Sequence, residues 1–129
     1  MNLLENLEIQ IQSITANQAI ITIEVSDKLK QPYGIVHGGI NAVLAETAAS
    51  LGANEWLRAQ GQTQIAIGVN LTTQHLRPVV KGTIKTIAKP IKTGRTIQTW
   101  EVKEFNENNL ISASIVTLMK KKRSNKKRG

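Results

Sequence analysis

The sequence of 129 residues contains no cysteine and only four aromatic residues. Without cysteine the chain has no disulfide, no thiolate metal site and no cysteine nucleophile. Four aromatic rings are too few for a surface that binds nucleic acid by base stacking. The two histidines, His37 and His75, have no metal-ligand spacing, and no HExxH motif or carboxylate cluster accompanies them. We therefore expect neither a metal nor a cofactor.

Long apolar runs are also missing. No stretch approaches the roughly 20 apolar residues that a membrane-spanning helix needs. The first residues, Met1–Asn6, lack the basic start and the apolar run of a signal peptide. No Gly-x-Ser-x-Gly, GxGxxG or Walker motif occurs, which argues against a serine hydrolase and against a phosphate-binding loop. We expect a cytoplasmic protein without membrane contact.

The net charge of +8 comes almost entirely from one end of the chain. Seven of the 17 basic residues lie within residues 120–129, so the other 10 basic residues nearly balance the 9 acidic ones. Such a basic run is typical of a solvated, disordered terminus. We therefore predict one domain over residues 1–119 and a basic tail over residues 120–129, and we do not expect the domain to bind nucleic acid.

Hydrophobic periodicity predicts strands on both sides of one helix. Apolar and polar residues alternate in six segments, which is the period of a strand with one buried face. Residues 26–39 contain proline and glycine and are predicted to form a loop. The predicted strands are residues 7–12, 19–25, 65–77, 83–91, 96–105 and 111–119. The side chains predicted to share a face are Ile65, Ile67, Val69 and Leu71 in one strand, Trp100 and Val102 in another, and Ile111, Ala113, Ile115 and Met119 in the last.

From Gly39 to about Ala59 apolar residues recur at three- and four-residue steps, the period of an α-helix. Alanine fills most of the other positions, so this helix should be apolar nearly all round and buried. A helix of that kind needs a sheet that wraps around it. The sequence therefore predicts an α+β fold, with a curved antiparallel sheet around one long central helix. Because the outer face of such a sheet would stay uncovered, we expect a dimer or a larger oligomer.

Glu46 is the single formally charged side chain between Gln31 and Asn54. A carboxylate on a buried helix is costly unless it is paired or has a chemical task. Burial would raise its pKa, which favours a role as general base. Ser50 follows four residues later, on the same helix face. The alternative is a glutamate at a subunit interface that pairs with an arginine or lysine, and spacing alone leaves both open.

Gly38 and Gly39 come directly before the predicted helix. Free backbone N–H groups at a helix start bind anions or a developing oxyanion, and glycine lets a substrate approach the backbone. His37 and Gln31 could both donate hydrogen bonds to a polarised carbonyl group. The plainer alternative is a flexible helix entry with a structural histidine.

The segment Gly34–Gly39, with Glu46 nine residues after His37, resembles the hotdog-fold thioesterases. The resemblance extends to about Met119, and its closest branch hydrolyses aromatic acyl-CoA, such as 4-hydroxybenzoyl-CoA and 1,4-dihydroxy-2-naphthoyl-CoA. It implies a thioester hydrolase that forms a dimer or a dimer of dimers, with CoA as part of the substrate. The implied roles are Glu46 as general base or nucleophile, the Gly38 amide as the group that polarises the carbonyl, Gln31 and His37 as groups that hold it, and Ser50 and Thr47 as hydroxyls beside the acid.

The resemblance also implies where CoA is bound. Cationic side chains in two stretches suit its phosphate groups, and the alternative is that they are solvated surface charges. The family has its active sites at the dimer interface, so Glu46 would face Gln31, His37 and Gly38 of the other subunit. The implied substrate-binding residues are Gly39, then His75, Arg77 and Pro78, and then Lys92, Thr93, Gly94, Arg95 and Thr96.

Two other functions are open at this point. The first is a hotdog hydratase or dehydratase, although the Asp-to-His spacing of that class is missing. The second is a binding module without enzymatic activity, for acyl-CoA or, through the basic tail, for nucleic acid.

Overall fold

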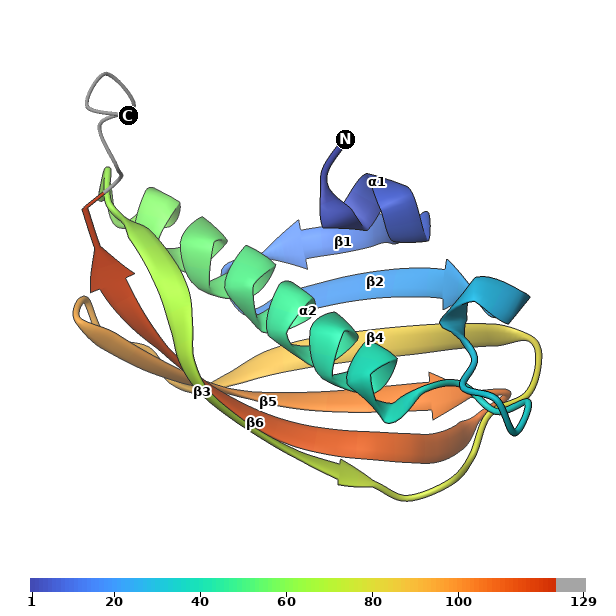
Figure 1. The fold of residues 1–129 in the computed structure, drawn as a ribbon. Helices are drawn as coiled ribbons and strands as arrows, with labels where there is room; N and C mark the ends of the chain where they lie inside the picture. The colour runs from blue at the N-terminus through green and yellow to red at the C-terminus, as the bar shows by residue number, and fades with distance from the viewer. Residues whose placement is uncertain (123–129) are drawn as a thin grey trace.

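A curved six-stranded sheet wraps around one long helix in the computed structural model, which describes residues 1–122 (Figure 1). Helix α2 (Gly38–Ala59) lies across the concave face of the sheet. The strand order is β1-β2-β4-β5-β6-β3, and all neighbours are antiparallel. The strands are β1 (Gln10–Thr15), β2 (Gln18–Glu24), β3 (Ile65–His75), β4 (Thr83–Lys92), β5 (Ile97–Asn106) and β6 (Asn109–Lys121). The predicted α+β fold, with its sheet around one central helix, is confirmed.

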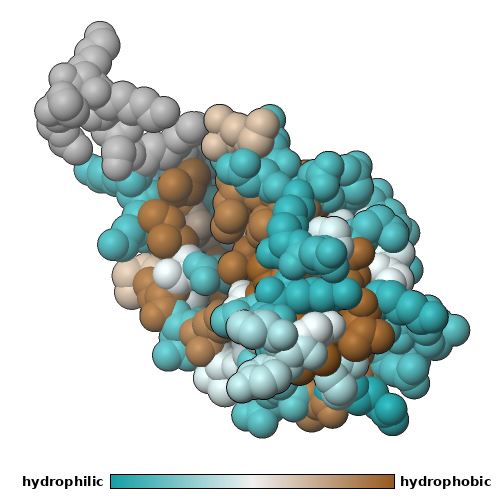
Figure 2. Space-filling view, turned by 45° about the vertical axis from the view of Figure 1, so that its right-hand side comes forward, coloured by the Kyte–Doolittle hydropathy of each residue, from teal (hydrophilic) through white to brown (hydrophobic). Residues whose placement is uncertain are grey.

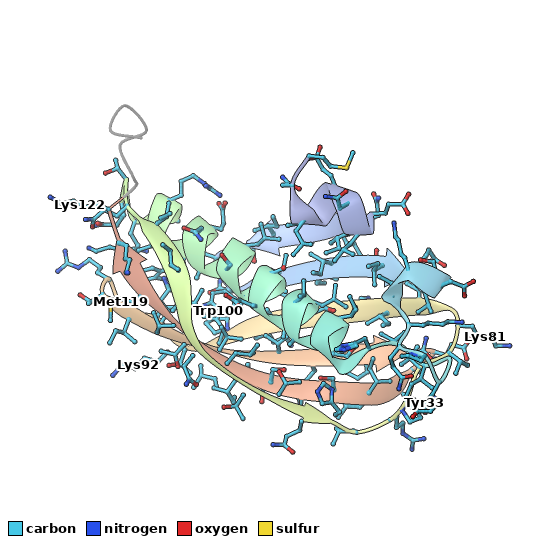
Figure 3. The ribbon with its side chains drawn as sticks, in the orientation of Figure 1. Tyr33, Lys81, Lys92, Trp100, Met119 and Lys122 are labelled. Carbon is cyan, nitrogen blue, oxygen red and sulfur yellow. The ribbon has the colours of Figure 1, made fainter. Side chains whose placement is uncertain are left out.

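The core lies between α2 and the concave face of the sheet. Trp100 is fully buried there, beneath the helix, and so is Val102, as the strand pattern predicts (Figure 3). A Cβ atom at Gly52 would lie 2.5 Å from the Trp100 ring, so the helix approaches the sheet closely only because position 52 has no side chain. Trp100 Nε1 donates to the Gln98 side chain at 2.8 Å, and Gln98 Nε2 donates to the carbonyl oxygen of Ala53 at 3.2 Å.

The N-terminal segment differs from the prediction. Residues Leu3–Leu7 form a short helix, α1, and the first strand starts only at Gln10. A capping box starts α1: the Asn2 side chain accepts from the Glu5 amide, and the Glu5 carboxylate accepts from the Asn2 amide, both at 3.0 Å. The apolar spacing over residues 7–12 therefore combines a helix end with a strand start. The predicted loop contains one 3-10 turn, η1 (Asp27–Leu29), and α2 starts one residue earlier than predicted.

The apolar residues predicted to share a face of β3 do not all face the core: Leu71 packs against it, but Ile67 and Val69 do not. Ala66 is buried, whereas Ile67 and Val69 are 41% and 50% exposed. A β-bulge between Gly68 and Asn70 shifts the alternation, and at Gly68 the Glu46 carboxylate occupies the space beside the strand, where a Cβ atom would lie 2.6 Å from Oε2. Ile67 and Val69 therefore reach the surface. Figure 2 shows that apolar side chains form patches among polar ones on the face that it draws.

The face predicted for β6 holds at Ile111, which is buried, but not beyond it. Phe105 pairs with Leu110 and Glu104 with Ser112, so Ile111 is the extra residue of a β-bulge. A one-residue shift moves every later side chain to the opposite face. Ile115 is therefore 40% exposed, and the side chains buried beyond the bulge are Ser112, Ser114, Val116 and Leu118.

Two further predictions need correction. Helix α2 is not buried all round: its sheet-facing side is covered, but Glu46 is exposed in the single chain. Lys120 and Lys121, assigned to the tail, are the last residues of β6, and the Lys120 amide donates to the Thr96 carbonyl oxygen at 2.8 Å. Lys122 follows the strand, and residues 123–129 of the predicted tail lie outside the described residues. No helix within residues 1–122 is long and apolar enough to cross a membrane.

Candidate functional site

The site begins at the N-terminus of α2. His37 caps the helix, because its Nδ1 accepts a hydrogen bond from the Gly39 amide at 2.8 Å. The ring proton of His37 is therefore on Nε2. The Gly38 amide is the first N–H of the helix and has no hydrogen-bond partner among residues 1–122. Gly38 thus supplies a free donor, whereas the amide of Gly39, predicted to bind substrate, is used within the cap.

A cleft of about 330 Å³ opens beside Gly38, and we call it the entry cleft. The His75 ring lies directly against this glycine: a Cβ atom at position 38 would lie 3.0 Å from Cε1 and 3.1 Å from Nε2 of the ring. Any other residue at position 38 would therefore displace the histidine. The lining residues include Gln31, Gly38, Asn41, His75, Arg77 and Pro78.

Asn41 is a site residue that the sequence patterns did not single out. Its side chain is buried, and its Nδ2 lies 3.4 Å from Nδ1 of His75, a long hydrogen bond. With the Asn41 amide in this orientation Nδ2 donates to Nδ1 of His75, which fits the tautomer that carries its proton on Nε2. A polar residue in the first turn of an otherwise apolar helix was the available signal. His75 was predicted as a nucleotide contact, and the structure places it at the helix start.

Gln31 lies in the same cleft. Its side-chain oxygen accepts a hydrogen bond from the Tyr33 amide. Its Nε2 group is therefore the part of the side chain that can donate to a ligand.

Glu46 lies eight residues after Gly38, which is about 12 Å along the helix axis. It borders two adjoining hollows of about 370 and 230 Å³, which we call the Glu46 groove. The predicted hydroxyl residues Thr47 and Ser50 line the larger hollow, and no hydrogen bond joins them to Glu46 within the described part of the chain. The groove is lined by Leu3, Leu4, Val43, Glu46, Thr47, Ser50 and Leu51 on one side and by Gly68, Val69, Asn70 and Leu71 on the other.

One chain does not bring all predicted residues together. The entry cleft holds the amide donors, and the Glu46 groove holds the carboxylate. The two predicted CoA-binding stretches are also apart. Ile97, directly after Lys92–Thr96, pairs with Met119, whereas His75 pairs with Ser112, seven residues or about 23 Å along β6. Figure 3 shows Lys92 near Met119 at one end of the sheet and Tyr33 at the other.

A row of polar side chains crosses the sheet beneath the entry cleft. Thr86, Glu104, Ser112 and His75 are direct cross-strand neighbours on β4, β5, β6 and β3. Thr86, Glu104 and Ser112 are buried. Burial raises the pKa of Glu104 from 4.5 to about 9, and the nearby Thr86 hydroxyl lowers it slightly. Glu104 is therefore neutral at pH 7.

The row contains polar atoms with no hydrogen bond of good geometry anywhere in residues 1–122. Sequence reasoning missed the row, because a glutamate in an alternating strand looks like any outward-facing polar residue. The atoms are both carboxyl oxygens of Glu104, the hydroxyl oxygens of Thr86 and Ser112, and Oδ1 of Asn41 above them.

The two halves supply complementary chemistry. The entry cleft offers N–H donors, which stabilise negative charge that develops on an oxygen atom. The Glu46 groove offers a carboxylate, which can activate water or attack a carbonyl carbon. Among residues 1–122 no three His, Asp or Glu side chains gather as ligands of a metal would. The arrangement suits acyl transfer to water.

Comparison with known proteins gives consistent matches. The model of the thioesterase superfamily matches residues 33–113, more than half of the chain. A 1,4-dihydroxy-2-naphthoyl-CoA hydrolase of Listeria monocytogenes is 35% identical over 124 residues, which cover 95% of this chain and 98% of that protein.

Solved structures agree. A thioesterase of Haemophilus influenzae superposes with a TM-score of 0.84 at 32% identity, over 92% of this chain and 82% of that one. A variant of a Staphylococcus aureus thioesterase superposes with a TM-score of 0.88 at 30% identity, over 94% and 99%.

Proposed function

This chain belongs to the thioesterase superfamily and is a thioester hydrolase, and we propose that its substrates are acyl-CoA thioesters with aromatic acyl groups. The observation that carries the proposal is the free Gly38 amide at the helix start, with a carboxylate, Glu46, on the same helix. The name of the Listeria relative, a hydrolase of an aromatic acyl-CoA, supports the choice of acyl group.

The reaction uses these groups as follows. The Gly38 N–H donates to the thioester carbonyl oxygen and stabilises the negative charge that forms there. Glu46 takes a proton from a water molecule that attacks the carbonyl carbon, or it attacks the carbon itself and water then hydrolyses the resulting anhydride. In either route the C–S bond breaks, CoA leaves as the thiol and the acyl group leaves as the free acid. CoA is part of the substrate, and no cofactor enters the reaction.

A second copy of the chain completes the site in this proposal. The Gly38 amide and the Glu46 carboxylate lie in separate depressions of one chain, so they need a partner to meet. β3 forms an edge of the sheet, and its exposed Ile67 and Val69 suit an interface. Pairing of two β3 edges about a two-fold axis would set the two α2 helices side by side and antiparallel, which brings each Glu46 toward the other helix start.

The same pairing accounts for the divided CoA-binding stretches. Thr96 lies at the end of β6 that borders the start of β3, since Lys120 contacts Thr96 and pairs with Ala66. In an antiparallel pair of β3 strands, the start of one β3 lies beside the end of the other. The stretch Lys92–Thr96 of one subunit would then lie on the same side as His75–Pro78 of the other. We propose a dimer, or a dimer of dimers, in the cytoplasm, and a naphthoyl substrate would place it in menaquinone biosynthesis.

A thiol-release assay tests the activity with benzoyl-, hydroxynaphthoyl-, phenylacetyl- and straight-chain CoA esters. We expect turnover of the aromatic esters, and we expect Glu46→Gln to lower kcat by about 10³-fold with an unchanged melting temperature. Glu55→Gln is the matched control, because Glu55 lies on the same helix but pairs with Arg58 outside the groove. Normal turnover by Glu46→Gln would contradict the catalytic role. Hydration of an enoyl-CoA without thiol release would favour the hydratase alternative.

A further inference from the structure

The ring of His75 lies against the glycine that carries the free amide. The ring edge formed by Nε2, Cε1 and Nδ1 faces Gly38, with Cε1 and Nε2 nearest, and Nδ1 also lies 3.4 Å from Nδ2 of Asn41. With Nδ2 of Asn41 as the donor to Nδ1, we expect the ring proton on Nε2. Both residues line the entry cleft. Gly38, which carries the free amide, and Nε2 of His75 therefore lie next to each other at its wall.

The polar row explains what holds this ring. Ser112 is the direct cross-strand neighbour of His75, and Glu104 is that of Ser112. Direct neighbours on one sheet face have Cβ atoms only about 5 Å apart, so the register sets these side chains in line toward the ring. Asn41 covers the line from α2. Oδ1 of Asn41, Oγ of Ser112 and both carboxyl oxygens of Glu104 are buried and without a partner in the described part of the chain.

A neutral carboxyl group suits the inner end of this line, because it can donate as well as accept. Glu104 can donate to the Ser112 hydroxyl, and that hydroxyl can donate to Oδ1 of Asn41. Nδ2 of Asn41 is then directed to Nδ1 of His75, as observed. Because these oxygens have no direct partner among residues 1–122, we expect the links to run through an ordered water molecule, which needs two to four polar partners of this kind. A carboxylate at the same place could only accept, and burial disfavours its charge.

We propose, on the basis of the thioesterase function above, that His75 is a second hydrogen-bond donor to the thioester carbonyl oxygen, through Nε2–H beside the Gly38 amide. Asn41, Ser112 and Glu104 are positioning residues that hold its tautomer and its orientation. Two preorganised donors stabilise the developing oxyanion more than one does, and their effect appears in kcat rather than in substrate affinity.

The first test is turnover of the best acyl-CoA substrate by the full-length protein. His75→Ala should lower kcat by about 10²-fold and change KM by less than about threefold. His75→Gln keeps an N–H donor and should recover part of the loss. A normal kcat in His75→Ala, with a wild type that hydrolyses the ester, would overturn this inference and leave the proposed function intact.

The second test compares two buried serines on the inward face of β6. Ser112 belongs to the row, whereas Ser114 donates to the Thr73 hydroxyl at 2.9 Å, outside it. Ser112→Ala should lower kcat about tenfold through misplacement of the ring, and Ser114→Ala should leave kcat unchanged. Glu104→Gln keeps a donor and an acceptor and should stay within about threefold of the wild type, and Glu104→Leu should lose about tenfold. Equal effects of the two serine variants would contradict the positioning role, even if Glu104→Leu fails to fold.

The third test needs no turnover. Nitrogen-15 NMR of the labelled protein reports the tautomer of His75, which we expect to carry its proton on Nε2. Asn41→Leu and Ser112→Ala should give a mixture of both tautomers, whereas Ser114→Ala should not. A proton on Nδ1 in the wild type would overturn the proposal. If the wild type hydrolyses no acyl-CoA, the proposed function fails, and the tautomer still decides whether the row positions His75.

Discussion

The two halves of the interface between α2 and the sheet differ in whether their buried polar groups have hydrogen-bond partners. In the C-terminal half Trp100 and Gln98 form a chain of hydrogen bonds that ends on Ala53, and the Asn54 side chain binds both backbone groups of Ala66. In the N-terminal half the helix lies over Glu104 and its neighbours in the polar row, whose side-chain oxygens have no partner within residues 1–122.

This difference separates a stabilising region from a reactive one. A buried polar group without a hydrogen bond costs about 1–3 kcal/mol, so the N-terminal half weakens the domain where the C-terminal half stabilises it. The weak half is the one that carries the free Gly38 amide, the His75 ring and, farther along the helix, Glu46. Unpaired polar groups are expected where a site needs them, and rarely elsewhere.

The largest effect that we expect is on the pH dependence of stability, and it comes from Glu104 in the N-terminal half. Its pKa is about 9 in the folded protein against 4.5 for the free side chain, so the folded state keeps a proton that the unfolded state releases between these values. The contribution of Glu104 to the free energy of unfolding is therefore complete below about pH 4.5. It declines as the pH rises toward 9, by several kcal/mol in total. When the pH is raised from 5 to 8.5, the urea concentration at the unfolding midpoint should decrease for the wild type. For Glu104→Gln it should decrease much less. The same decline in both proteins would show that Glu104 is not held neutral.

The second-largest effect is expected at Gly52, where the missing side chain leaves room for the Trp100 ring. Gly52→Ala puts a Cβ atom 2.5 Å from ring carbons that a hydrogen bond to Gln98 holds in place. Alanine stabilises a helix relative to glycine, so helix propensity alone would make this variant more stable. We expect instead a net loss of about 2 kcal/mol in the free energy of unfolding, caused by overpacking against the ring. The melting temperature should fall, while kcat of the folded enzyme stays normal. If the ring is the cause, Trp100→Phe should cost less in the Gly52→Ala background than alone, whereas additive effects would contradict it.

We expect the smallest effects from replacing two asparagines of α2, Asn54 and Asn41, by alanine. Asn54 makes hydrogen bonds to Ala66 and Ser50, whereas Oδ1 of Asn41 has no partner in the described part of the chain. Asn54→Ala should therefore lower stability by about 1–2 kcal/mol and spare kcat. Asn41→Ala should lower stability less and reduce kcat. Urea unfolding and the thiol-release assay on both variants check this, and a reversed order would undo the contrast between the two halves.

Sequence patterns were sufficient for the architecture, because it depends on local periodicity. The three- and four-residue steps of α2 and the alternation in the strands identify the elements in their order. The same patterns failed where two periods overlap or shift. The five residues of α1 are too few to separate a helical period from an alternating one, and the bulge at Ile111 moved the rest of β6 to the other face.

For the site, the sequence was informative about residues with a local reason to stand out. Gly38 and Gly39 precede an apolar helix, and Glu46 is its lone charge; the roles of these residues stay predictions. The structure corrected the burial of Glu46, which depends on how far the sheet curves around the helix. It also placed Gly39 within the cap formed by His37, a matter of side-chain geometry.

The chain's local chemistry thus prescribes one helix between strands, a glycine helix entry and a carboxylate eight residues along. Only the packed molecule decides that the His75 ring lies against Gly38, that Ser112 and Glu104 line up behind it, and that Glu104 stays neutral. These features join residues far apart in the chain through strand register. They also depend on burial, because removal from water makes a carboxylate costly and a protonated carboxyl group the stable form.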